Sequence, residues 1–352
     1  MMTPPTDTVG PDVRLYRGDA MAVLAGMDDA SVDAVVTDPP AGIGFMGKEW
    51  DGDRGGRVRW IEWLSGILAE CYRVAKPGAR LLCWSLPRTN HWTGTAVEDA
   101  GWVVEDVIAH LFGSGFPKHA SKLKPAREDW WLARKPGGKV PPLGIDECRV
   151  PAPDGVPIFD RFRLGNGIEP GAINPSRRTG DTSSLGRWPA NVTHDGSDVI
   201  LAGFPETESG KVEPHHMRRA ESQKQYGGFG GKFGDIPLTG FGDSGSAARF
   251  FYCAKPDPEE RAGNIHPTVK PLALMRWLVR LVSKPDDVIL DPFAGSGTTP
   301  VAALLENRRC QAIEHDESYY ATALSRLQHA AGRSPGQLFA VLGDENLTPG
   351  GT

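Results

Sequence analysis

Two stretches of this sequence place an acidic side chain at the end of an apolar run and follow it with a tight turn. Residues 35–41 read VVTDPPA, so that Asp38 is followed by Pro39 and Pro40. Residues 288–299 read VILDPFAGSGTT, so that Asp291 is followed by a turn rich in small residues. Each stretch is a candidate ligand site at the end of a buried strand.

The turn after Asp291 has the chemistry of an anion or nucleoside site. Gly295 and Gly297 can adopt positive φ and let the backbone approach a ligand closely. Ser296, Thr298 and the free N–H groups at the start of the following helix suit a carboxylate or phosphate. No lysine follows the second glycine, which excludes a phosphate loop. Taken alone, the two glycines could equally serve a structural strand–helix turn.

The Asp38-Pro39-Pro40 string has a different chemistry. Two prolines hold the backbone extended and carry no N–H, so nearby carbonyl groups can point into a cleft beside the carboxylate. An isolated Asp-Pro-Pro is common in structural turns. Its occurrence together with the 288–299 string favours a chemical role.

Together the two strings resemble the amino-group DNA methyltransferases, which use S-adenosylmethionine to methylate adenine N6 or cytosine N4. The resemblance implies that Asp38, Pro39, Pro40 and position 41 hold the target base. The catalytic string precedes the cofactor turn, which resembles the permuted β-class order. This chain departs from the family pattern at one place, because the aromatic residue expected after the prolines is Ala41.

The same resemblance implies a set of cofactor contacts. Lys270 and Thr268, in a His-Pro-Thr-x-Lys-Pro string, would pair with the carboxylate of the cofactor, and Glu314 would accept both ribose hydroxyls. Asp19 would lie near the adenine or ribose, although it could instead cap a turn. The full predicted set is Asp19, His266, Thr268, Lys270, Asp291, Pro292, Phe293, Gly295, Ser296, Gly297, Thr298 and Glu314.

Ala41 leaves three explanations open. Activity could have been lost naturally, a ring from the adjoining loop (Phe45 or Trp50) could compensate, or the residue could have been changed deliberately to stop turnover. Because the surrounding motifs are intact, the sequence favours the third explanation and a weakened or inactive enzyme.

The elements that would position these residues follow a β–α–β order. Strands are expected at 13–19, 32–37, 80–85, 102–111, 248–254, 288–290 and 309–313, with helices at 20–26, 61–74, 91–100, 272–282, 300–305 and 318–331. This order and the resemblance predict an α/β fold with a doubly wound, mostly parallel, seven-stranded Rossmann-like sheet.

The expected organisation is a catalytic domain interrupted by an insert. Residues 12–112 would form the base-binding half and 246–332 the cofactor-binding half, with 1–11 and 333–352 as flexible tails. Residues 113–245 would form the target-recognition region, beginning with a helix and a strand between 119 and 135. Its later part, 151–245, contains 17 Gly and 9 Pro, too many for long regular elements.

Charge is consistent with DNA as a partner. The chain carries a net charge of −5, but residues 113–190 contain 13 Lys and Arg against 8 Asp and Glu. A basic insert in an acidic body is a plausible DNA-facing surface, although an ordinary solvated surface is the alternative. The candidate DNA contacts are Lys118, Lys122, Arg177, Arg178 and Arg187.

The sequence therefore predicts a DNA methyltransferase acting on double-stranded DNA, with adenine N6 favoured because Asp begins the catalytic string. Cytosine N4 and a catalytically silent DNA-binding relative are the alternatives; an RNA or protein methyltransferase is disfavoured. Five scattered cysteines and the lack of a membrane-length apolar run favour the cytoplasm and argue against a zinc site. A homodimer and a companion restriction enzyme are further possible partners.

Overall fold

A central β-sheet organises the described part of the chain. The computed structural model describes residues 4–116, 120–151, 186–208, 244–256 and 269–332. In this part ten strands form one sheet in the order β1-β2-β12-β11-β3-β4-β6-β5-β7-β10. The strands are β1 (Asp7–Val9), β2 (Val13–Arg17), β3 (Val32–Thr37), β4 (Ala75–Ser85), β5 (Val103–Leu111), β6 (Arg127–Arg134), β7 (Val192–His194), β10 (Tyr252–Cys253), β11 (Val288–Asp291) and β12 (Arg309–Glu314).

The sheet is mostly parallel, as expected. Strands β2, β12, β11, β3 and β4 run parallel to one another, whereas β6 lies antiparallel between β4 and β5. These seven strands equal the expected number, but β6 takes the place of the strand expected at 248–254. Strands β1, β7 and β10 extend the sheet at its two edges. Two further short strands, β8 (Glu206–Glu208) and β9 (Ser244–Ser246), pair separately.

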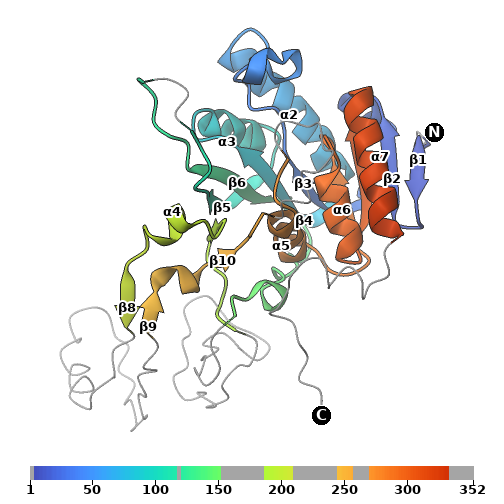
Figure 1. The fold of residues 1–352 in the computed structure, drawn as a ribbon. Coiled ribbons are helices and arrows are strands. Elements are labelled where there is room, and N and C mark those ends of the chain that lie inside the picture. The colour runs from blue at the N-terminus through green and yellow to red at the C-terminus, as the bar shows by residue number, and fades with distance from the viewer. Residues whose placement is uncertain (1–3, 117–119, 152–185, 209–243, 257–268, 333–352) are drawn as a thin grey trace, which may run out of the picture.

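Helices cover both faces of the sheet, which makes it doubly wound (Figure 1). Buried residues of α1 (Ala20–Ala25), α2 (Arg57–Val74) and α3 (Asn90–Asp99) pack on one face. Those of α5 (Leu272–Val282), α6 (Thr298–Leu305) and α7 (Glu317–Ala331) pack on the other. The remaining helix, α4 (Asp198–Leu201), is a single turn.

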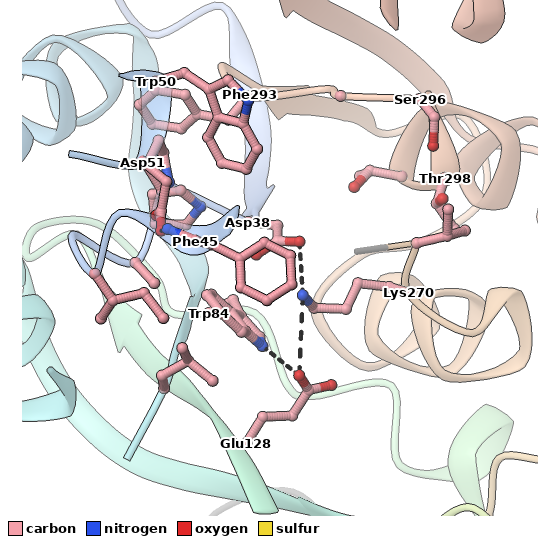
Figure 2. A pocket seen from close by; sticks show the side chains of 18 of the residues that line it. Asp38, Phe45, Trp50, Asp51, Trp84, Glu128, Lys270, Phe293, Ser296 and Thr298 are labelled. Carbon is pink, nitrogen blue, oxygen red and sulfur yellow. Dashed lines mark hydrogen bonds and ion pairs between the residues drawn. The ribbon is translucent and has the colours of Figure 1, made fainter. Parts of the chain in front are cut away.

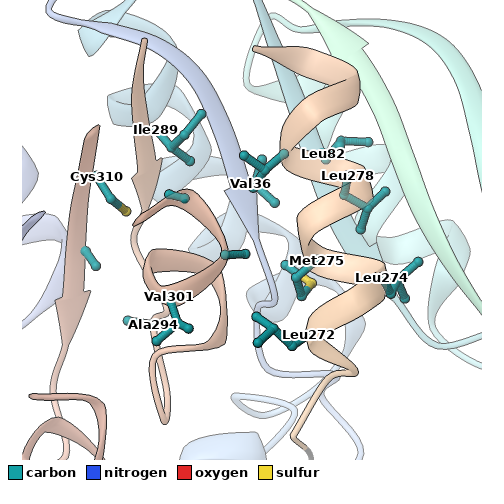
Figure 3. Packing of buried hydrophobic residues seen from close by; sticks show 14 of the residues in the cluster. Val36, Leu82, Leu272, Leu274, Met275, Leu278, Ile289, Ala294, Val301 and Cys310 are labelled. Carbon is teal, nitrogen blue, oxygen red and sulfur yellow. The ribbon is translucent and has the colours of Figure 1, made fainter. Parts of the chain in front are cut away.

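The alternation of buried residues in the strands explains the two faces. Successive side chains of a strand point to opposite sides of a sheet. Val35 therefore packs with α1 and α2, whereas its neighbour Val36 packs with α5 and α6. Figure 3 shows Val36 facing Leu278 of α5. The apolar runs of the sequence therefore mark strands that are buried on both faces.

Several expectations about the elements are wrong. Residues 1–11 are not a tail throughout, because β1 pairs antiparallel with β2. No helix forms in residues 120–126. Residues 248–254 do not form one strand: Ser246 Oγ accepts the N–H of Ala248 and starts a 3-10 turn at 247–250, which leaves only β10 extended.

The boundary expected at residue 113 does not coincide with an edge of the sheet. Strand β6 lies within the predicted insert, yet it pairs with β4 and β5 over most of its length. Strand β7, also within the insert, pairs parallel with β5 on the side away from β6. The catalytic sheet and the predicted recognition region therefore share strands.

Candidate active site

A cavity of about 1440 Å³ lies along the edge of the sheet where β2, β3, β4, β11 and β12 end. Ligands of open α/β sheets bind at the carboxyl ends of the strands. Sites for one small ligand usually measure about 300–1,000 Å³. This cavity therefore has room for more than one small ligand.

The cavity brings together most of the residues that the sequence predicted. Those that line it are Asp19, Asp38, Pro39, Pro40, Ala41, Lys122, Lys270, Asp291, Pro292, Phe293, Gly295, Ser296, Thr298 and Glu314. Arg187 does not line it and instead donates to the backbone of Pro151 and Arg249. His266, Thr268, Lys118, Arg177 and Arg178 lie outside the described residues.

Gly297 allows the close packing of the two helices that follow the glycine-rich turn, α6 and α7. It adopts φ +83° as the residue before α6, and a Cβ built on it would lie 2.8 Å from the Cβ of Ala323 in α7. Any side chain here would both strain the turn and push α6 away from α7. This glycine is therefore required for the packing of α6 against α7.

The two candidate strings meet through a buried hydrogen bond. Thr37 Oγ1 donates to Oδ1 of Asp291 over 2.9 Å, and the N–H of Phe293 donates to the same oxygen over 3.0 Å. Asp291 is 1% exposed, and burial raises its pKa to about 6. A hydrogen bond between residues 254 positions apart in the chain thus holds the predicted base-binding string beside the glycine-rich turn.

Glu314 braces the glycine-rich turn from the end of β12. Its Oε2 accepts the N–H of Gly295 and its Oε1 accepts the N–H of Asp316, each over 2.7 Å. Burial raises its pKa to about 7. Because each carboxylate oxygen has a further lone pair, Glu314 can still accept two hydroxyl groups.

Asp19 has the geometry of a capping residue, the alternative role that the sequence left open. Its Oδ1 accepts the N–H of Ala22 over 3.1 Å and caps α1. It lines the cavity as well. The capping role is visible in the structure, and a contact with a nucleoside would add to it.

A chain of charged and aromatic groups crosses the base-binding end of the cavity (Figure 2). Lys270 Nζ lies 2.8 Å from Oδ2 of Asp38 and 3.9 Å from Oε2 of Glu128. It also lies 3.8 Å from the centre of the Trp84 ring, whose Nε1 donates to Glu128 over 2.8 Å. The Lys270 ammonium is therefore shared by two carboxylates and one aromatic face.

These neighbours set the charge of Asp38. Burial raises its pKa to about 6, although the nearby Lys270 works in the opposite direction. At neutral pH Asp38 is accordingly an ionised hydrogen-bond acceptor. The sequence predicted that Lys270 would pair with a cofactor carboxylate, but in this structure its partner is the carboxylate of Asp38.

The loop after the prolines is fastened by a buried acid. Asp51 is 1% exposed and accepts the N–H groups of Gly42 and Phe45 over 3.1 and 2.8 Å. This arrangement places the Phe45 ring in the cavity, beside the Asp38–Lys270 pair (Figure 2). Trp50 packs edge-on against Tyr319 of α7, with ring centres 6.5 Å apart.

Sequence reasoning missed Trp84, Glu128 and Asp51. Glu128 belongs to no motif, but a signal existed: the amino end of an antiparallel strand lies beside the carboxyl ends of its parallel neighbours. Asp51 carries no such signal, since its partners are backbone groups of its own loop.

The described residues contain no group of three or more His, Cys, Asp and Glu side chains that could hold a metal ion. Among the same residues, no helix is long and apolar enough to cross a membrane.

The geometry can be compared with known proteins. Residues 32–325 match the DNA methylase family N6_N4_Mtase, a span that includes both candidate strings. The chain belongs to this family. In this family member the predicted base-binding string comes first in the sequence and the glycine-rich turn near the end.

Individual relatives agree with this assignment. The type II methyltransferase M.BglII of Bacillus subtilis is 25% identical over 309 residues, which span 87% of this chain and 66% of that protein. The DNA adenine methyltransferase YhdJ of Escherichia coli K12 is 41% identical over 76 residues, 22% of this chain and 26% of that protein. The structure of the PvuII DNA methyltransferase, specific for cytosine N4, shares the fold, with a TM-score of 0.52 and 13% identity over 93% of this chain and 94% of that one.

Proposed function

We propose that this protein transfers a methyl group from S-adenosylmethionine to the N6 amine of adenine in double-stranded DNA. The observation that carries the proposal is the meeting of Asp38-Pro39-Pro40 with the glycine-rich turn in one cavity, joined by the Thr37–Asp291 hydrogen bond. The cavity volume has room for a cofactor and an extruded base.

The residues at the cofactor end suit S-adenosylmethionine. Glu314 offers two carboxylate oxygens to a ribose, and the hydroxyls of Ser296 and Thr298 line the same turn. Phe293 and Tyr319 supply aromatic walls for an adenine. The cofactor supplies a methyl group on a positively charged sulfur, and the acidic floor of the cavity favours that charge.

The residues at the other end act on the target amine. A ring-conjugated amine is a poor nucleophile, because its lone pair is delocalised. When Asp38 and a proline carbonyl accept its two N–H bonds, the nitrogen can become tetrahedral and direct its lone pair at the methyl group. This nitrogen would accept the methyl group as the bond from that methyl group to sulfur breaks, with S-adenosylhomocysteine as the leaving group, and would release one proton to solvent.

Two considerations favour adenine over cytosine. Aspartate begins the base-binding string, and family members acting on cytosine N4 more often begin it with serine. The relative YhdJ, whose name specifies adenine, shares 41% identity over its matched segment. Cytosine N4 is the alternative product.

Methylation of DNA with labelled S-adenosylmethionine tests the proposal. Digestion of the product to nucleosides should show labelled N6-methyladenine, and Asp38→Ala should abolish the label while leaving cofactor binding intact. Labelled N4-methylcytosine would establish the alternative substrate. Cofactor and DNA binding without any label would identify a catalytically silent relative.

A further inference from the structure

Arg127 stands at the mouth of the cavity, in none of the motifs that define the site. It is the first residue of β6, which runs antiparallel to β4 and β5. The amino end of β6 therefore lies at the edge where the parallel strands end, with Asp129 opposite Ser85 and Arg127 opposite Leu111. Arg127 lines the cavity, and its neighbour Glu128 reaches Lys270 at the base-binding end.

A buried carboxylate fixes the orientation of the Arg127 guanidinium. Nε donates to Oδ1 of Asp129 over 2.6 Å and Nη2 donates to Oδ2 over 2.8 Å. Asp129 is fully buried and is itself held by Asn90, which donates to Oδ2 over 2.7 Å. A planar guanidinium that makes two hydrogen bonds to a fixed carboxylate cannot rotate freely.

The two hydrogen bonds to Asp129 leave other donors of Arg127 available for a ligand. They use two of the five N–H groups of the guanidinium, and within the described residues no partner accepts from Nη1. The Arg127 side chain is 52% exposed even though Asp129 is not exposed at all. The free donors therefore face solvent at the cavity mouth.

Three other basic side chains that line the cavity are exposed, whereas two acids at its proposed base-binding end are largely buried. Arg88, Lys122 and Lys124 also line the cavity, are exposed, and make no ion pair in the described part of the chain. Asp38 and Glu128 lie at the floor. A nucleotide that enters base-first presents its amine to the acids and leaves its phosphate at the rim. The basic side chains would therefore lie near the phosphate of the nucleotide, and the acidic side chains near the amine of its base.

Resting on the proposed function, we propose that Arg127 binds a backbone phosphate of the DNA strand whose base enters the cavity, with Asp129 as the residue that positions it. A planar pair of N–H donors matches two phosphate oxygens. The contact would anchor the extruded nucleotide beside Asp38.

Salt-dependent DNA binding tests this contact without relying on turnover. The probe is a fluorescent duplex with one adenine mismatch, where extrusion of a base costs least. Arg127→Gln should weaken binding about tenfold and reduce the slope of log K against log salt by about 0.9, the value for one phosphate. Arg127→Lys should retain most of the slope, because it keeps the charge.

Lys284→Gln is the matched control. Lys284 is exposed and lies near the amino end of β11, away from the carboxyl ends of the strands where the cavity lies. Its replacement should therefore change neither the DNA affinity nor the salt slope. Unchanged binding of S-adenosylmethionine by each variant confirms the fold.

A neutral methylphosphonate next to the mismatched adenine should weaken binding by the native chain but not by Arg127→Gln. If Arg127→Gln leaves the slope of log K against log salt unchanged, the proposal is wrong. If that slope is unchanged but the preferred DNA sequence changes, Arg127 contacts a base instead of a phosphate. If the native chain fails to bind any DNA, the proposed function itself is wrong.

Discussion

Glu314 is the acid whose protonation should bear most directly on cofactor binding, if it accepts the ribose hydroxyls as proposed. Burial raises its pKa to about 7 in the ligand-free protein. Hydroxyl donors of a bound ribose favour the ionised form and lower that pKa. Affinity should therefore rise as pH increases through 7 and level off above it.

Calorimetry with S-adenosylmethionine should show about tenfold weaker binding at pH 6 than at pH 8, the change that one carboxyl group with this pKa produces. Glu314→Gln should flatten this dependence, and Glu314→Ala should weaken binding by about 1–3 kcal/mol. The exposed neighbour Glu317→Ala is the control. Equal affinity at both pH values would remove Glu314 from the ribose site.

Phe45 could replace the ring that position 41 lacks. Ala41 and Phe45 both line the cavity, but Ala41 is 9% exposed and packs in the core, whereas the Phe45 ring lies beside Asp38. The sequence favoured a deliberate substitution at position 41, but this placement supports compensation by the loop.

We expect Phe45→Ala to lower single-turnover methyl transfer about tenfold or more, since one base–aromatic stack is worth about 1–3 kcal/mol. Cofactor affinity should be unchanged. Met46→Ala, which alters an adjacent side chain that is 75% exposed, should have no effect. If Phe45→Ala is harmless and Ala41→Tyr accelerates transfer at least tenfold, position 41 is the true site of the ring.

At the scale of elements, the loop of residues 42–51 depends on one carboxylate. Asp51→Ala removes the acceptor of two N–H groups, those of Gly42 and Phe45. Hydrogen exchange at these two amides should accelerate, and the free energy of unfolding should fall by about 1–3 kcal/mol.

Asp53→Ala is the matched control, because the side chain of this exposed aspartate, just after the loop, accepts the N–H of Gly55 and no N–H of the loop itself. Unchanged protection of the Phe45 amide in Asp51→Ala would show that other contacts hold the loop.

The elements also show what sequence could and could not predict. Helix α5 was predicted to the residue, since apolar positions recur at helical spacing between Pro271 and Ser283. Strands β3 and β11 were predictable because each is rich in apolar β-branched residues and has an acid at its carboxyl end, Asp38 just after β3 and Asp291 as the last residue of β11. Strand β10 was overpredicted, because a side-chain cap from Ser246 outcompeted the β-propensity of Phe250 and Phe251.

Some residues of the candidate site could likewise be predicted from the sequence, and others could not. Asp38, Asp291 and Glu314 were found because each ends a strand of its own. The partner of Lys270 could not be found, because its distance to Asp38 depends on how α5 packs on the sheet. Glu128 was missed for a similar reason, since it comes from a strand assigned to the insert.

For the whole molecule, buried acids make the ligand-free fold sensitive to pH. Burial raises the pKa of Asp38 and Asp291 to about 6 and that of Glu314 to about 7. A native state that holds protons more tightly than the unfolded chain loses stability as pH rises. Unfolding should therefore require less free energy at pH 8 than at pH 6.5.

The expected difference is about 1 kcal/mol, mostly from Glu314. It can be measured by urea denaturation without cofactor, with Glu314→Gln as the variant that should reduce it. The range stops at pH 6.5 because burial lowers the pKa of His110, which destabilises the fold in more acidic solution. Greater stability at pH 8 would contradict this reasoning.

The position of β11 and β12 in the sheet has a consequence for how the protein is made. These strands come last in the chain, yet they fill the gap between β2 and β3, which come first. Until β11 and β12 have left the ribosome, β2 and β3 each present an unpaired edge at the future centre of the sheet. Such edges pair readily with other chains. The nascent protein is therefore vulnerable to aggregation while the residues between β3 and β11 are synthesised, and the arrival of β11 and β12 closes its core.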